Sequence, residues 1–438
     1  MKSSLVYKMY RKIAKDIFFT FSTTIIITVL GFACSIVIAR ILGPSSQGLL
    51  KEVLTLPVLT YTFFNFGLES AIMYYGAKER NFSSINKVAN QLWLCFSLVV
   101  AVIGLLFLIF GQGYYKDIPM VYISAILPLP IINFYMSVQT AILRAENDFL
   151  RYNRTMIIRQ VAYTVVIAML FVIPNVWVVI AAHYVLAFTG MVCCLGGVHH
   201  KDNCISRPYF KDMMRYGFKF YLSNVINYLN YRFDIILMTP TVNKSDVGVY
   251  TVAQAMSEMI WMIPNSVSTV LLPRLSSLEL EEKRAVTLRV CRYVATAMLV
   301  LVVFAYLLAD WIIPLIYSNR YLGSILPFKI LLVGTLFMTY GKILVNAIAS
   351  YGKPEKNLPA IIAGSLSNVV LNIYMIPAYG IIGAAISGAI SYTILSIVTI
   401  VSFMKLNEGK VRIVDLLVMN RSDFSALASK VRQKLMRK

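Results

Sequence analysis

Two basic residues of this sequence stand inside long apolar segments, where an ionised side chain is costly. Arg232 belongs to the segment at 217–239 and Lys342 to the segment at 325–350. Guanidinium and ammonium groups form charge-assisted hydrogen bonds with phosphate oxygens, so cations that face a cleft at membrane depth would suit a diphosphate. A second interpretation is open for both residues, because a long basic side chain can also extend to the membrane interface.

Polar and aromatic residues share a helical face beside Arg232. At about 100° per residue, four of them fall within about 100° of arc, and Arg232 flanks the group. The four are Asn224, Asn227, Tyr228 and Tyr231. A polar stripe on an otherwise apolar helix indicates a face turned toward a wet cavity. Tyr rings on that face would suit the faces of sugar rings.

Two further polar ridges follow the same logic. Asn346 follows Lys342 at i+4, on the same face of the segment at 325–350. Asn368 and Asn372 are spaced i, i+4 in the segment at 357–377. Contact with a ligand and hydrogen bonding between helices are both open for these asparagines.

Acidic residues inside apolar segments are candidates for charge pairing or for coupling transport to an ion. Glu258 lies near the middle of the segment at 248–273, and pairing with Arg232 or Lys342 is its simplest role. Carrying a proton or a cation is the alternative. Glu69 lies nearer the end of the segment at 49–75, where an interfacial position is also open.

Catalytic and metal-binding patterns do not stand out in the sequence. We find no phosphate-binding glycine loop, no acidic pair with metal spacing and no Ser/His/Asp arrangement. The six cysteines lack zinc-ligand spacing. The sequence therefore predicts a protein that is not an enzyme and has no cofactor or metal, with energy from an ion gradient, a substrate gradient or a partner.

The segments that position these residues are membrane helices. Hydrophobic residues make up 58% of the 438, and the mean hydropathy is +0.71. Apolar runs of about 20 residues, each long enough to cross roughly 30 Å of hydrocarbon, recur along the chain. We predict an all-α integral membrane protein with about twelve spans: 17–39, 49–75, 88–111, 118–143, 156–173, 176–198, 217–239, 248–273, 293–316, 325–350, 357–377 and 381–404.

The distribution of basic residues orients these spans. Of the 41 Lys and Arg, 33 fall on the N-terminus, the even-numbered connections and the C-terminal tail, and 6 fall on the odd-numbered connections. The positive-inside rule then predicts a multi-pass membrane protein with both termini in the cytoplasm. The net charge of +21 is explained by topology and by contact with anionic membrane lipids, so we expect no nucleic-acid partner.

The two halves of the sequence resemble each other. Gly48-Leu49-Leu50 opens the second span, and Gly248-Val249-Tyr250 opens the eighth, 200 residues later. Because six spans make up each half, the halves would share one orientation. We predict a six-helix lobe at 1–200, a second at 201–404 around a central cavity, and a basic cytoplasmic tail at 405–438.

Three stretches point to a known family. They are residues 40–44 with Gly48, which fit the pattern R-x-L-G-P-x-x-x-G; residues 143–149 with Tyr152-Asn153; and residues 351–354 with Asn368, Asn372 and 376–385. In this order and spacing they resemble the O-antigen and capsule flippases of bacteria, a branch of the multidrug/oligosaccharidyl-lipid/polysaccharide exporters.

The resemblance implies two six-helix lobes, a V-shaped cavity and alternating access. It also implies a substrate, an undecaprenyl-diphosphate-linked oligosaccharide that is moved from the cytoplasmic to the outer leaflet. A polysaccharide polymerase and a chain-length regulator would be its protein partners. An ion-coupled multidrug antiporter of the same superfamily is the alternative. A polymerase or sugar transferase is a third class, and the short outer loops argue against it.

Overall fold

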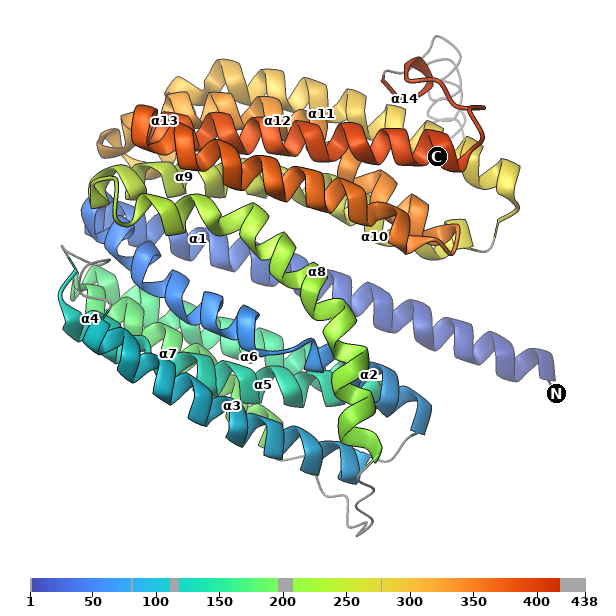
Figure 1. The fold of residues 1–438 in the computed structure, drawn as a ribbon, viewed down its shortest axis with the longest axis horizontal. Helices are drawn as coiled ribbons and strands as arrows, with labels where there is room; N and C mark the ends of the chain where they lie inside the picture. The colour runs from blue at the N-terminus through green and yellow to red at the C-terminus, as the bar shows by residue number, and fades with distance from the viewer. Residues whose placement is uncertain (1, 80–81, 111–117, 196–207, 277, 418–438) are drawn as a thin grey trace, which may run out of the picture. The chain divides into compact units, whose positions relative to one another are not determined.

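The protein is all helical in the part of the chain that its computed structural model describes, residues 2–79, 82–110, 118–195, 208–276 and 278–417 (Figure 1). Contacts divide the chain into two compact units. Unit 1 comprises residues 1–228 and 243–248, and unit 2 comprises residues 229–242 and 249–438. The boundary falls inside a continuous helix rather than between residues 200 and 201. The division of the sequence into repeats at residue 200 stays a prediction.

Unit 1 is built from the first helices of the chain. They are α1 (Lys2–Phe64), α2 (Leu68–Glu79), α3 (Phe82–Phe110), α4 (Met120–Ile126), α5 (Leu129–Ala145), α6 (Phe149–Ala168), the 3₁₀ turn η2 (Met169–Phe171), α7 (Val176–Leu195) and the first part of α8 (Pro208–Met238). One core gathers buried side chains of α1, α4, α6 and α7, including Ile38, Ile123 and Ile180.

Unit 2 contains the end of α8 and the remaining helices. They are α9 (Lys244–Ile260), α10 (Met262–Ser276), α11 (Leu280–Tyr317), η3 (Asn319–Ser324), α12 (Ile325–Ser350), η4 (Pro354–Asn357), α13 (Leu358–Leu406) and α14 (Val414–Leu417). Its core packs α10, α11, α12 and α13 around Met298, Ile343 and Phe403.

Eight helices in the described ranges are long and apolar enough to cross a membrane. Two of them, at Phe19–Phe64 and Pro354–Leu406, have 46 and 53 residues. At 1.5 Å per residue, each is more than twice as long as the roughly 30 Å of hydrocarbon requires. Both turn back on themselves (Figure 1), at Gly43 (φ 78°) and Gly380 (φ 55°), where a side chain would strain the backbone.

The predicted seventh and eighth spans are absent from these eight for a local reason. Helix α8 carries charged residues along its length, and the predicted eighth span is divided at Trp261 into α9 and α10, of 17 and 15 residues. An all-helical, multi-pass architecture is thus present, whereas the number twelve stays a prediction. Exposed apolar side chains, such as Leu98 and Phe304, cover the outer faces of α3 and α11, as expected of lipid-facing helices.

The two loops that suggested an internal repeat approach each other within unit 1. A Cβ placed on Gly48 would lie 1.7 Å from the carbonyl oxygen of Lys244, and one on Gly248 would lie 2.0 Å from that of Pro44. Each position therefore admits no side chain. The sequence singled out both glycines without predicting that they meet.

Candidate functional site

Arg232 and Glu258 form a bidentate ion pair within unit 2. The two guanidinium nitrogens Nη1 and Nη2 donate to the carboxylate oxygens at 2.9 and 3.2 Å, from α8 to α9. The side chains keep 28% and 27% of their exposure, so the pair is accessible from one side. Arg232 is thus held by a carboxylate rather than extended to an interface, and Glu258 takes the pairing role that the sequence favoured for it.

Asp234 lies beside this pair and is buried. Its carboxylate accepts hydrogen bonds from the Tyr250 hydroxyl at 2.5 Å, the Gln254 amide at 3.2 Å and its own helix at the backbone N–H of Ile235. A buried carboxylate needs such donors, because an unpaired charge is costly in an apolar interior.

Lys342 lies against aromatic rings. Its ammonium group sits 5.2 Å from the ring centre of Tyr231 and 5.0 Å from that of Trp261, and it donates to the Tyr231 hydroxyl at 3.3 Å. Tyr392 packs edge-on to Trp261, with ring centres 5.0 Å apart. Within the described residues no carboxylate pairs with Lys342, so its charge is balanced only by ring faces.

The formal charge of this cluster depends on its acids. With both carboxyls ionised, Arg232, Lys342, Asp234 and Glu258 sum to zero. A proton on Glu258 would leave a net charge of +1 beside the aromatic rings. An anion therefore meets a more attractive site when an acid of the cluster is neutral.

The predicted asparagines make hydrogen bonds between or along helices. Asn346 donates to Ser268 at 2.6 Å, and Ser268 in turn donates to the backbone carbonyl of Lys342 at 2.6 Å. Asn372 donates to Asn368 at 2.9 Å, and both are buried. Of the two open interpretations of these asparagines, the contacts support hydrogen bonding within the helix bundle.

Other predicted site residues fall in unit 1. The Tyr228 hydroxyl donates to the carbonyl of Thr55 at 3.4 Å. Glu69 accepts from the Tyr61 hydroxyl and from Arg144 at 3.1 Å, so it is charge-paired at the end of α5. The side chains of Asn224 and Asn227 lie outside the described residues, although their backbone belongs to α8.

Sequence reasoning missed several members of the unit 2 cluster. Tyr250 and Gln254 precede the predicted Glu258 by eight and four residues on α9, a polar ridge that periodicity alone would reveal. Trp261 and Tyr392 carry no such signal. Their role follows from the contact of Tyr392 on α13 with Trp261 at the break between α9 and α10, which no local pattern encodes.

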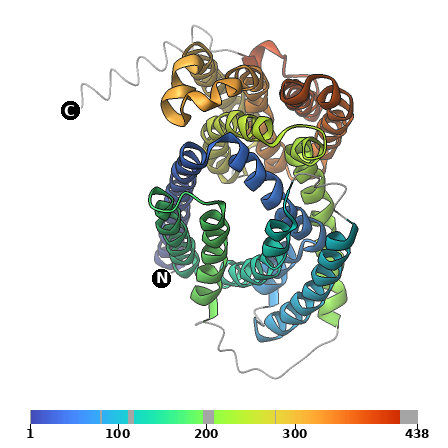
Figure 2. The same ribbon diagram turned by 90° about the vertical axis from the view of Figure 1, so that its left-hand side faces the viewer.

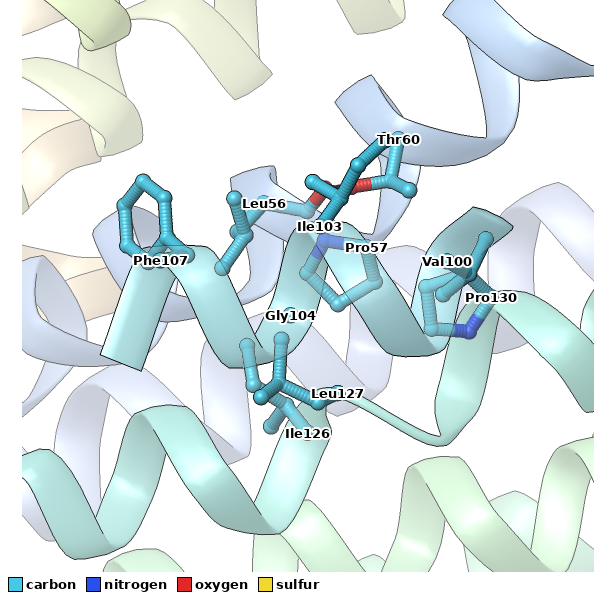
Figure 3. A pocket seen from close by; sticks show the side chains of 10 residues that line it. All are labelled: Leu56, Pro57, Thr60, Val100, Ile103, Gly104, Phe107, Ile126, Leu127 and Pro130. Atoms are coloured by element: carbon cyan, nitrogen blue, oxygen red, sulfur yellow. Dashed lines mark hydrogen bonds between the residues drawn. The ribbon is translucent and has the colours of Figure 1, made fainter. Parts of the chain in front are cut away.

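A small apolar cavity lies apart from this cluster of charged and aromatic residues. A pocket in unit 1 lined by apolar side chains of α1, α3 and α5, including Leu56, Phe107 and Pro130, has a volume of about 20 Å³ (Figure 3). It holds about one water molecule and no substrate. Within the described residues, no group of three or more His, Cys, Asp and Glu is placed to hold a metal.

Curated relatives are membrane proteins. An uncharacterized membrane protein of Methanocaldococcus jannaschii is 29% identical over 212 residues, which cover 46% of this chain and 41% of the relative. A probable low-salt glycan biosynthesis flippase of Haloferax volcanii is 20% identical over 213 residues, 47% of this chain and 45% of the relative. The chain thus aligns with less than half the length of each of these two relatives.

Solved transporter structures share the fold. The lipid II flippase MurJ, in an inward closed conformation, superposes with a TM-score of 0.77 at 16% identity, covering 92% of this chain and 89% of MurJ. An inward-facing multidrug resistance MATE family transporter of the MOP superfamily gives a TM-score of 0.67 at 18% identity, with 88% and 96% covered. The predicted fold class, an all-α integral membrane protein, is confirmed.

The sequence also matches a family described as polysaccharide biosynthesis protein over residues 37–326, which include the Arg232–Glu258 pair but not Lys342. The matched segment covers most of the chain, and it agrees with the resemblance seen in the three sequence stretches. The chain belongs to this polysaccharide biosynthesis family, and its fold is similar to that of MurJ and a MATE transporter.

Proposed function

We propose that this protein is a flippase that moves an undecaprenyl-diphosphate-linked oligosaccharide from the cytoplasmic to the outer leaflet of a bacterial inner membrane by alternating access. Membership in a polysaccharide biosynthesis family and a fold shared with a lipid II flippase support this proposal. The product would serve surface polysaccharide biosynthesis, with a polymerase and a chain-length regulator as downstream partners. Both termini would be cytoplasmic.

The observation that carries the proposal is the combination of cations and rings in unit 2. Arg232 donates to the backbone carbonyl of its neighbour Tyr231 at 3.4 Å, and the Lys342 ammonium group lies against the rings of Tyr231 and Trp261. Phosphate oxygens would bind the two cations, and sugar faces would stack on the rings. We assign substrate contacts to Arg232, Lys342 and Tyr231, and keep Tyr228 and the asparagines at 224, 227, 346, 368 and 372 as candidates.

Glu258 gives this site a means of coupling. While Glu258 is ionised, its carboxylate accepts hydrogen bonds from both Nη1 and Nη2 of Arg232. Protonation of Glu258 would free those donors for a diphosphate, and release of the proton would expel the anion. Proton movement and substrate release would then be linked through one carboxylate.

The experiment uses purified protein in liposomes that contain a fluorescent polyprenyl-diphosphate oligosaccharide. The rate at which the label reaches the outer leaflet is read with a membrane-impermeant quencher. We expect measurable transbilayer movement with the natural sequence and a loss of at least tenfold with Arg232→Ala or Lys342→Ala.

Lys356→Ala is the matched control, because Lys356 is an exposed cation in the 3₁₀ turn η4, away from the cluster. Movement at the natural rate in Arg232→Ala and Lys342→Ala would remove both residues from the substrate site. Absence of movement with every lipid-linked sugar tested, together with normal folding, would reject the flippase function itself.

An ion-coupled multidrug antiporter is the second candidate. It is favoured by the carboxylates of Asp234 and Glu258 beside an aromatic cluster, since rings and carboxylates also bind organic cations. Extrusion of a cationic dye that requires a proton or sodium gradient and fails in Glu258→Gln would support it. Dye movement that ignores the gradient would exclude it.

A further inference from the structure

A second polar pocket lies in unit 1, where α6 begins and α7 ends; these helices pack side by side (Figures 1 and 2). Its volume is about 400 Å³. The side chains that line it are Leu150, Arg151, Arg154, Thr155, Ile158 and Cys193, with Asp148 at the rim. This pocket shares no residue with the cluster around Arg232 and Lys342.

The two arginines of the pocket differ in how they are held. Arg151 donates through Nη2 to the carbonyls of Cys193 and Cys194 at 3.4 and 3.3 Å, and so satisfies the end of α7. Arg154 is exposed and makes no hydrogen bond or ion pair with any residue that the structure describes. One guanidinium is therefore fixed as a wall of the pocket, and the other is available to a ligand.

The acid at the rim is already engaged. The Asp148 carboxylate caps α6 by accepting from the backbone N–H of Arg151 at 3.0 Å. The pocket therefore keeps a net charge of +1, at the start of a helix whose backbone dipole also favours an anion. A phosphate group would have one free guanidinium and one partly used guanidinium as donors.

The surroundings of the pocket are apolar and exposed. Leu150 and Ile158 at its wall are 68% and 41% exposed, and Val165 on α6 and Val192 on α7 are 61% and 65% exposed. Side chains of this kind on the outside of a membrane helix contact lipid tails. A cationic pocket beside such a surface matches the two parts of an anionic phospholipid, because the pocket suits the charged headgroup and the apolar surface suits the acyl chains.

We propose that this pocket binds the phosphate headgroup of an anionic phospholipid, with the acyl chains along the exposed apolar face of α6 and α7. The pocket lies in the connection that charge distribution assigns to the cytoplasmic side, where basic pockets between helices meet anionic headgroups. The apolar rim distinguishes this ligand from free phosphate, which would gain nothing from Leu150 or Ile158. The proposal is independent of the transported substrate.

The test measures retained lipid by native mass spectrometry of the purified protein in detergent. We expect phosphatidylglycerol to be retained over phosphatidylcholine of the same chain length. Arg154→Gln should weaken retention about fivefold, since one surface cation contributes about that factor near a membrane, and Arg154→Glu should weaken it further. Lys356→Gln removes an exposed cation elsewhere and should leave retention unchanged.

Four outcomes would overturn the proposal. Equal retention of the two phospholipids would show that the pocket does not distinguish their headgroups. An unaltered ratio of retained phosphatidylglycerol to phosphatidylcholine in both Arg154 variants would show the same. Displacement of phosphatidylglycerol by millimolar inorganic phosphate would assign the pocket to a free anion. Retention of polyprenyl diphosphate with no retention of phosphatidylglycerol would assign it to the transported lipid instead.

Discussion

Lys342 is the cation of the unit 2 cluster that no carboxylate pairs with in the described residues. Its ammonium group lies over the rings of Tyr231 and Trp261 and lacks an ion-pair partner in the described residues. Arg232, by contrast, donates to Glu258 through both Nη1 and Nη2. An arriving anion can bind Lys342 without breaking an existing ion pair. Lys342 is therefore the side chain we expect to meet the substrate first.

Replacing Lys342 by Met keeps the length of the side chain and removes its charge. We expect diphosphate affinity to fall about tenfold to a hundredfold, because a hydrogen bond to a charged group contributes about 1.5–3 kcal/mol. Binding of a fluorescent polyprenyl diphosphate to protein in detergent measures it. Lys342→Arg keeps the charge and should retain most of the affinity; equal affinities in Met and Arg variants would contradict the role.

The Glu258–Arg232 pair should contribute to stability as well. Glu258→Gln leaves a partly buried guanidinium with one weaker acceptor, and we expect a loss of about 1–3 kcal/mol in the free energy of unfolding. The matched control is the pair Asp310–Lys329, 2.7 Å apart, in which the acid Asp310 is exposed, and Asp310→Asn should cost at most about 1 kcal/mol. Thermal unfolding in detergent compares the two, and equal shifts would show that partial burial adds nothing.

The residue types and the faces of the site could be predicted from the sequence, but not all of its contacts. Helical periodicity placed Tyr231 and Arg232 together on α8. The free-energy cost of an ionised side chain at membrane depth singled out Lys342 and Glu258. The role of Trp261 was beyond reach, because it depends on where α9 breaks and which ring of α13 packs against it. Periodicity describes one helix at a time, whereas a binding site draws on several.

At the scale of elements, the positions where helices break were harder to predict from hydropathy than the positions of the spans. Hydropathy located most spans, and it treated residues 40–48 and 378–380 as short connections. At both places the structure joins two helices by a tight turn, where Gly43 and Gly380 reverse the chain within one or two residues. Hydropathy averages over about 20 residues and cannot distinguish a tight kink from a short loop.

The contact between the start of the second half of α1 and the start of α9 depends on two missing side chains. Gly48→Ala and Gly248→Ala each place a methyl group within about 2 Å of a backbone oxygen, so the helices must separate. We expect the folded protein recovered from membranes to drop severalfold in both variants. Fluorescence-detected size exclusion measures the yield.

Gly31→Ala provides the comparison for this experiment. Gly31 also lies in α1, but the nearest atom to an added Cβ is the Gln160 amide nitrogen, 4.0 Å away. Its yield should equal that of the natural sequence or exceed it, since Ala favours a helix over Gly. A similar loss of yield at all three positions would show that α1 is intolerant of substitution in general.

At the scale of the whole molecule, charge sets the orientation. Basic residues concentrate on one set of connections, and the pocket around Arg154 belongs to that set. The same asymmetry that orients the chain during insertion would thus supply the headgroup contacts afterwards. The large net charge needs no partner beyond the membrane itself.

Reporter fusions test this orientation. A fluorescent protein that folds only in the cytoplasm should be active when fused after Lys405, and alkaline phosphatase, which needs an oxidising compartment, should be active when fused after Asn175. The reciprocal fusions should be inactive. Activity of alkaline phosphatase fused after Lys405 would show that the topology is opposite to the predicted one. The Arg154 pocket would then lie on the outer side of the membrane.

The glycine contact also says something about ancestry. In a symmetric dimer, a residue i of one copy meets residue j of the other, and j meets i in return. Gly48 faces Lys244 while Gly248 faces Pro44, and both positions are shifted by the same 200 residues. The contact has the form of a homodimer interface enclosed in a single polypeptide, as a tandem gene fusion would leave it. A protein that contained only the first of the two loops would find the missing partner surface in a second copy of itself.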